Sequence, residues 1–140
     1  MTDTVSTTPL ATTPSFNFGF QKFVVADLAP LRAFYEKALG LAVGQTIEGE
    51  GFTELVMRKP GVDTGFSLIL FHYKDGRKIT VGDGHGPMGF FVRDVDAAYA
   101  HALANGAKPD RVPYDTGNMR VAFVRDPEGR EIEMISMKRP

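Results

Sequence analysis

An internal repeat constrains this chain more than any other feature of its sequence. Residues 23–28 (FVVADL) match residues 90–95 (FFVRDV), so that Asp27 and Asp94 stand 67 positions apart. Residues 57–60 (MRKP) match residues 124–127 (VRDP), and Pro60 and Pro127 are again 67 positions apart. Two separated matches at one offset indicate a duplicated unit, and two copies are too few for a solenoid. The sequence therefore predicts two half-domains.

Each copy has the pattern of a strand, a helix and three further strands. In the first copy, an alternating Phe- and Val-rich strand precedes Asp27, a residue type that caps helix N-termini. An apolar stripe at helical spacing follows, and Gly40 is expected to end that helix as a left-handed cap. In the second copy, Asp94 or Asp96 takes the capping place and Gly106 the terminating one. The strands are expected at 20–26, 42–47, 52–59 and 66–73, and then at 88–93, 108–112, 118–125 and 131–137.

Length and composition predict one globular domain. With 140 residues, we expect a Thr-, Ser- and Pro-rich arm at 1–15 and a single domain at 16–140, with half-repeats at about 20–80 and 87–137. Basic and acidic residues are interspersed and the net charge is −1, which argues against a nucleic-acid partner. No apolar stretch approaches the ~20 residues of a membrane span. The chain has no cysteine, and we expect a cytoplasmic location.

Three motifs carry a resemblance to a known family. The opening residues Val25-x-Asp27-Leu28, the middle segment Phe91-x-x-Asp94-Val95-Asp96 and the closing segment 126–133 (DPEGREIE) resemble the signatures of the vicinal-oxygen-chelate superfamily. That superfamily includes glyoxalases, bleomycin-resistance proteins and dioxygenases. The resemblance implies an α+β fold in which tandem βαβββ repeats form one eight-stranded, cup-like sheet with two helices. The fold alone does not select a reaction.

The resemblance also implies four positions where metal-dependent relatives ligate a divalent ion with His, Glu or Gln. The first ligand lies seven residues before the Asp matched by Asp27, which is Phe20 here. The second falls at Ile69 or Leu70, the third at Pro87 and the fourth at Glu133. Glu133 alone has a ligating side chain, so the sequence predicts a cup without the usual metal site and without a cofactor.

A shifted ligand set is the alternative. His72, His85 and Glu133 would form a two-His-one-carboxylate set of the kind that binds iron, with Mn, Ni or Zn as other candidates for one divalent metal. This reading needs His72 to slide by two residues along its strand. It also needs the following strand to extend back to His85.

The remaining polar and aromatic residues of the predicted cup suggest a ligand pocket. Glu133 is a candidate general base, and Arg120 is a candidate for gripping an anionic group. The predicted lining is Phe20, Phe52, Ile69, Phe71, His85, Tyr114, Met119, Arg120 and Glu133. Three functions stay open: a metal-independent binder of a small apolar or aromatic molecule; a metal enzyme of the glyoxalase I (lactoylglutathione lyase) or extradiol-dioxygenase type; and a metal-free lyase or isomerase with Glu133 as base. A homodimer is expected from the resemblance.

Overall fold

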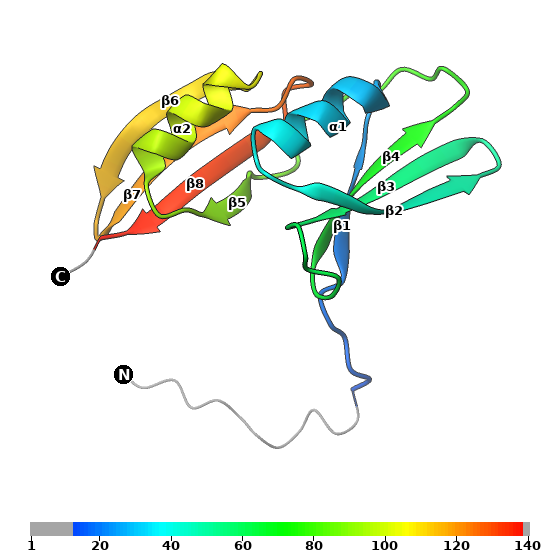
Figure 1. Ribbon diagram of the computed structural model, residues 1–140, viewed down its shortest axis with the longest axis horizontal. Helices are drawn as coiled ribbons and strands as arrows, with labels where there is room; N and C mark the ends of the chain where they lie inside the picture. The colour runs from blue at the N-terminus through cyan, green and yellow to red at the C-terminus, as the bar shows by residue number, and fades with distance from the viewer. Residues whose placement is uncertain (1–12, 139–140) are drawn as a thin grey trace.

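The computed structural model describes residues 13–138 and has the predicted order of elements twice (Figure 1). The first copy comprises β1 (Phe20–Val24), α1 (Leu28–Lys37), β2 (Ala42–Gly49), β3 (Phe52–Arg58) and β4 (Ser67–Tyr73). The second comprises β5 (Met88–Phe91), α2 (Val95–Ala104), β6 (Lys108–Thr116), β7 (Met119–Arg125) and β8 (Glu131–Met137). The predicted fold class is confirmed, with the eight strands hydrogen-bonded as two sheets of four. Of the arm predicted at 1–15, residues 1–12 lie outside the described part of the chain.

The two sheets have the same topology. Their strand orders are β1-β4-β3-β2 and β5-β8-β7-β6, with β1 parallel to β4 and β5 parallel to β8. The edge strand β6 is longer than the predicted 108–112, because its pairing with β7 resumes after two register shifts, from Pro109 to Arg111 and from Arg111 to Tyr114. Prolines cannot donate to a ladder, so a strand that contains Pro109 and Pro113 is tolerated at an edge with bulges.

One hydrophobic core serves both halves. Leu31, Phe34 and Tyr35 of α1 belong to the same buried cluster as Ile132 and Met134 of β8. Because side chains alternate along a strand, the residues between the core positions point to the other face of each sheet. We call these the open faces. They carry Phe20, Lys22, Glu54, Ile69 and Phe71 in the first half and Gly89, Phe91, Phe123 and Glu133 in the second.

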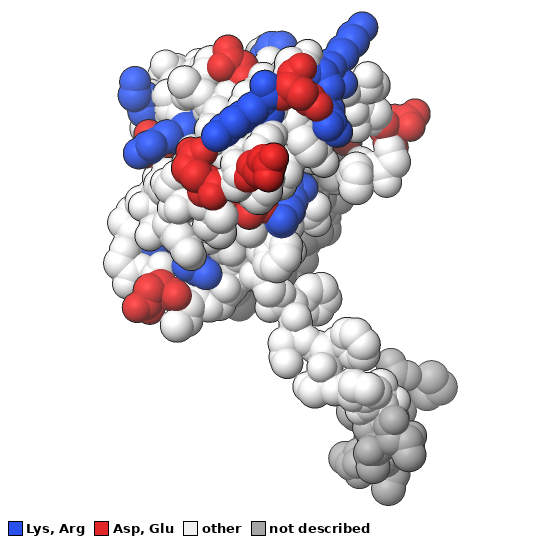
Figure 2. All heavy atoms as spheres, turned by 90° about the vertical axis from the view of Figure 1, so that its right-hand side faces the viewer, with Lys and Arg blue, Asp and Glu red and all other residues white. Residues whose placement is uncertain are grey.

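The surface outside the open faces is mixed in charge. On the side shown in Figure 2, basic and acidic side chains lie interspersed, and neither sign forms a continuous patch. Several of them form ion pairs, such as Lys74 with Glu48 and Arg77 with Asp75. Within residues 13–138, neither helix is long and apolar enough to cross a bilayer.

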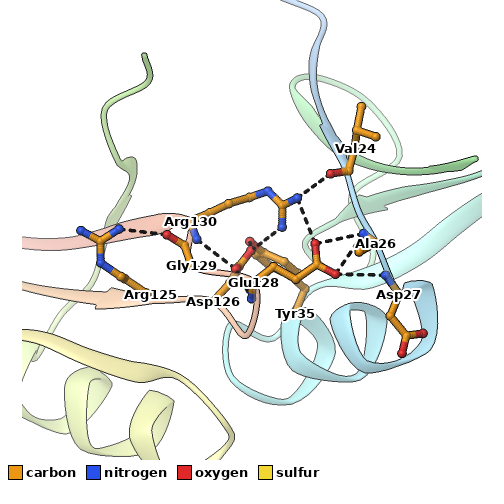
Figure 3. A network of polar contacts seen from close by, with 9 residues as sticks. All are labelled: Val24, Ala26, Asp27, Tyr35, Arg125, Asp126, Glu128, Gly129 and Arg130. Carbon is orange, nitrogen blue, oxygen red and sulfur yellow. Dashed lines mark hydrogen bonds and ion pairs between the residues drawn. The ribbon is translucent and has the colours of Figure 1, made fainter. Parts of the chain in front are cut away.

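The turn between β7 and β8, residues 126–130, joins the two halves (Figure 3). Asp126 is fully buried and accepts hydrogen bonds from the Tyr35 hydroxyl at 2.8 Å and from the Arg130 guanidinium at 3.1 Å. Burial, followed by the nearby Asp126 carboxylate, raises the pKa of Tyr35 far above its ordinary value. Arg130 also donates to the carbonyl oxygen of Val24 and pairs with Glu128. This part of the closing motif is therefore structural.

The helix caps only partly follow the sequence prediction. Asp94 caps α2, its carboxylate accepting from the backbone N–H of Ala97 at 3.1 Å. Asp27 stands at the N-cap of α1 but its side chain makes no capping hydrogen bond, so that prediction is wrong. The Glu128 carboxylate instead accepts from the backbone N–H groups of Ala26 and Asp27, each at 3.0 Å. Gly40 and Gly106 both have positive φ, as expected of left-handed helix ends.

Candidate functional site

A crevice of about 450 Å³ lies where the two halves meet. One wall is β1, another is the linker around 79–88, and a third is the start of β8 with the end of β7. We call it the seam crevice. Four of its lining residues can carry charge on an accessible side chain: Lys22, His85, Arg125 and Glu131. The site therefore draws on both copies of the repeat.

Lys22 stands at the border between the seam crevice and the open face of the first sheet. Its ammonium forms an ion pair with Glu54, whose side chain is only 9% exposed. The same ammonium lies over the rings of Phe20 and Phe71, 5.6 and 5.3 Å from their centroids, within the range of a cation–π interaction. The side chain of Lys22 remains 41% exposed. A fixed positive charge is thus accessible at this border.

Aromatic rings continue along the same open face. Phe52 and Phe71 stack with centroids 5.0 Å apart and an interplanar angle of 13°. Tyr73 meets Phe71 edge to face, with centroids 4.7 Å apart. Such an array offers flat apolar surface to a ligand. The predicted lining residues Phe20, Phe52, Ile69 and Phe71 all lie on this face.

Glu133 lies on the open face of the second sheet. It is half-buried and stands in register with Gly89 on one side and Phe123 on the other. Lys22 stands in register with Ile69 in the same way, and Lys22 and Gly89 are 67 positions apart. Ile69, and not Leu70, is therefore the counterpart of Glu133. The interval from Ile69 to Glu133 is only 64 positions because the β3–β4 connection (59–66) is three residues longer than 126–130.

The positions that ligate a metal in relatives do not fit one here. Phe20, Ile69 and Pro87 have no donor atom in their side chains, so Glu133 would stand alone. Among the described residues, no three His, Asp or Glu side chains lie close enough to hold an ion. The alternative set is not assembled within a chain, because His72 points to the helix-facing side of β4, with Nδ1 3.2 Å from the carbonyl oxygen of Val25. His85 lines the seam crevice.

Arg120, predicted to grip an anionic group, does not line the seam crevice. It shares strand parity with the core residues Ala122 and Val124 and donates to Asp96 of α2 at 2.8 and 2.9 Å. It also donates to Asp115 at 3.0 Å. These hydrogen bonds lower the pKa of Asp96 and raise that of Arg120, and they occupy the guanidinium on the helix-facing side.

Tyr114 and Met119, the other predicted lining residues of the second half, lie on β6 and β7. Tyr114 of β6 is in register with Val121, and the guanidinium of Arg111 lies 4.5 Å from the Tyr114 ring centroid. Met119 begins β7 and pairs with Met137 at the end of β8. Both lie in the second sheet, on strands that are not adjacent to β5, and neither lines the seam crevice.

Lys22 and Glu54 are the site residues that the sequence reasoning missed. Their counterparts at the repeat offset are Gly89 and Val121. The sequence does contain a signal for this pair: a charged residue stands inside a strand where the other copy has a small or apolar residue. Comparing the two copies position by position would have found the pair.

Comparison with known proteins agrees with this architecture. Residues 18–134 match the family model of the Glyoxalase/Bleomycin resistance protein/Dioxygenase superfamily. A lactoylglutathione lyase of Salmonella typhimurium is 30% identical over 118 residues, covering 81% of this chain and 87% of that protein. The chain belongs to the Glyoxalase/Bleomycin resistance protein/Dioxygenase superfamily.

Solved structures share the fold at lower sequence identity. Glyoxalase I of Zea mays superposes with a TM-score of 0.78 at 22% identity, over 88% of this chain but only 45% of the maize chain. A glyoxalase family protein of Bacillus cereus superposes with a TM-score of 0.77 at 19% identity, over 94% of this chain and all of that one. The present chain thus spans less than half of the maize protein and the whole of the bacterial one.

Proposed function

We propose that this protein binds a small apolar or aromatic molecule in its cup without the divalent metal of its metal-dependent relatives. The observation that carries the proposal is the replacement of three of the four ligand positions by Phe20, Ile69 and Pro87. Aromatic side chains on the open face beside the seam crevice support an apolar ligand. The cysteine-free sequence agrees with the cytoplasmic location that we expect.

Metal analysis of protein purified without chelator tests the proposal. We expect Fe, Mn, Ni and Zn all well below one equivalent, and a melting temperature that rises with naphthalene-type ligands because a ligand that binds only the folded state stabilises it. Stoichiometric metal that is lost in a His85→Ala variant would overturn the metal-free reading. Metal-free protein that is stabilised by no apolar compound would overturn the binding function.

We further propose that the protein is a homodimer in which a second copy packs against the exposed apolar residues at the ends of the open faces and leaves the ligand site accessible. Phe91 is 83% exposed and Phe20 56% exposed on these faces, and Met137 ends the same face of β8 at 51%. Apolar surface of this kind marks an interaction site. Analytical ultracentrifugation is expected to give a dimer for the unmodified chain and a monomer for Phe91→Lys. A monomeric unmodified chain contradicts the proposal.

Lyase activity is a second candidate, favoured by the 30% identity to a lactoylglutathione lyase. In a metal-free version, Glu133 is the candidate base, since its carboxylate is half-buried beside the side-chain-free Gly89. Incubation with S-lactoylglutathione, with and without added Ni²⁺, tests this candidate. Turnover that is lost in Glu133→Gln supports it. Absence of turnover under both conditions leaves binding as the favoured function.

A further inference from the structure

We propose that Lys22 is an anion-binding residue and that the ligand carries a carboxylate or similar anionic oxygen on an aromatic group. This inference rests on the proposed function and names the ligand class. It starts from the charge that the first sheet places at the border of the seam crevice. A cation at this place has no counterpart in the second half, where the matched residue is Gly89.

The surroundings of Lys22 hold its ammonium in place and leave part of it free. An ammonium has three N–H donors, and Glu54 is the acidic group with which it forms an ion pair. The rings of Phe20 and Phe71 present their faces to the cation. They help to hold it, but a ring face does not satisfy an N–H donor as an oxygen acceptor would. Two donors are thus available on a side chain that is 41% exposed.

The position of Lys22 determines the sign of the ligand charge. It stands in register with Ile69, the counterpart of Glu133, where metal-dependent relatives place a chelating side chain. The ammonium is paired with Glu54, but that carboxylate is nearly buried whereas the Lys22 side chain is 41% exposed, so the solvent-facing side of the pair presents N–H donors that suit an anionic oxygen. Of the other basic residues on the crevice wall, Arg130 is nearly buried between Asp126 and Glu128. Arg125 is as exposed as Lys22 but has two acidic neighbours, Asp110 and Glu131, where Lys22 has one, and no aromatic ring lies beside it as Phe20 and Phe71 lie beside Lys22 among the described residues.

The aromatic array determines the shape of the ligand. Phe71 contacts the Lys22 ammonium and stacks on Phe52, so charge and flat apolar surface adjoin. A planar aromatic acid can place its carboxylate at Lys22 and its ring against these phenylalanines. An aliphatic phosphate satisfies only the first requirement, and a neutral aromatic only the second.

Binding of 2-naphthoate and its neutral analogue 2-naphthamide, measured by calorimetry, tests the inference. We expect the unmodified protein to bind the naphthoate at least ~10-fold more tightly, a factor that corresponds to one charge-assisted contact. The double variant K22M/E54Q should lose this preference and keep its affinity for the naphthamide. Changing both residues avoids leaving Glu54 buried without its partner. A melting curve verifies that the variant folds.

Matched controls separate the local effect from a general loss of charge. Lys74 forms the ion pair with Glu48 at the outer end of the same sheet, so K74M should keep the full preference for naphthoate. K22R should keep it as well. Equal binding of the two compounds by the unmodified protein, or a preference that survives in K22M/E54Q, overturns the inference while the proposed function stands. Failure to bind either compound overturns both.

Discussion

The N-terminal ends of the two helices occupy matched positions of the repeat but are held in different ways. In α2, Asp94 accepts from the N–H of Ala97, so the second half completes its own helix. In α1, the N–H groups of Ala26 and Asp27 donate to Glu128, which belongs to the other half. The carboxylate also suits the positive end of the helix dipole. Duplication thus produced one self-sufficient unit and one that depends on its neighbour.

The two matched turns explain the difference. The turn after β7 has Asp126 and Glu128, whereas Lys59 and Gly61 stand 67 positions earlier in the turn after β3. A glycine has no side chain with which to reach a helix N-terminus. The turn after β3 is also three residues longer. Only one of the two turns therefore ties the halves together.

The largest effect of this asymmetry is expected for the variant Asp126→Ala. Asp126 is fully buried, and its removal leaves Arg130 with reduced charge compensation and Tyr35 without a hydrogen-bond acceptor. We expect a loss of about 3–5 kcal/mol in the free energy of unfolding, measured by urea denaturation. The matched change Lys59→Ala, at an exposed position, should stay within about 0.5 kcal/mol. Similar losses in the two variants would show that the turns are equivalent.

A smaller effect is expected when the Glu128 contact before α1 is compared with the Asp94 cap of α2. Glu128→Ala should cost about 2 kcal/mol and Asp94→Ala about 1 kcal/mol, because Glu128 accepts from two backbone N–H groups and also pairs with Arg130, whereas Asp94 caps α2 through one. Hydrogen exchange distinguishes the two mechanisms. In Glu128→Ala the amides of Ala26 and Asp27 should lose protection, and in Asp94→Ala that of Ala97 should. An unchanged exchange rate of the Ala26 amide in Glu128→Ala would contradict the hydrogen bond between Ala26 and Glu128.

The smallest effect is expected for Arg120→Met, which removes surface hydrogen bonds of the second half. Arg120 lowers the pKa of Asp96 below its ordinary value of 3.8. A lowered folded-state pKa contributes stability above the ordinary value, and that contribution is lost as the pH falls through the folded-state pKa. The difference in melting temperature between Arg120→Met and the unmodified protein should therefore be small at pH 7 and vanish toward pH 2. Binding of 2-naphthamide should not change, since Arg120 lies on the helix-facing side.

Much of the fold could be predicted because the repeat reports each element twice. The positions of Gly40 and Gly106, and the capping role of Asp94, follow from local chemistry alone. The missing cap of α1 has a local cause that the residue type of Asp27 does not reveal: Ala97, which donates to Asp94 in α2, is matched by Pro30 in α1, and proline has no backbone N–H to donate. β6 extends past the predicted end at Val112 because the edge strand bulges and then pairs again with β7, which a local pattern does not reveal.

The candidate site was predicted less well than the fold, because the motifs do not show which face of its strand each side chain occupies. Arg120 lies on the same face of β7 as Ala122 and Val124, and these two residues belong to the core. Its side chain therefore points away from the open face, although its strand does line the cup. Likewise, His72 lies on the same face of β4 as the core residues Leu68 and Leu70. Lys22 and Glu54 do not occupy the ligand positions that the family resemblance implies, so the motifs do not point to them. An ion pair across one intervening strand is a property of the sheet, not of any local motif.

The turn at residues 126–130 also has a consequence for the order in which the chain acquires structure during synthesis. Glu128 follows Ala26 by 102 residues, so the segment that leads into α1 gains its contact with the Glu128 carboxylate only after nearly the whole chain has been translated. Contacts of such sequence separation form late and slowly. The first half emerges from the ribosome before the segment that completes it, and during that interval its apolar stripe is open to chaperones.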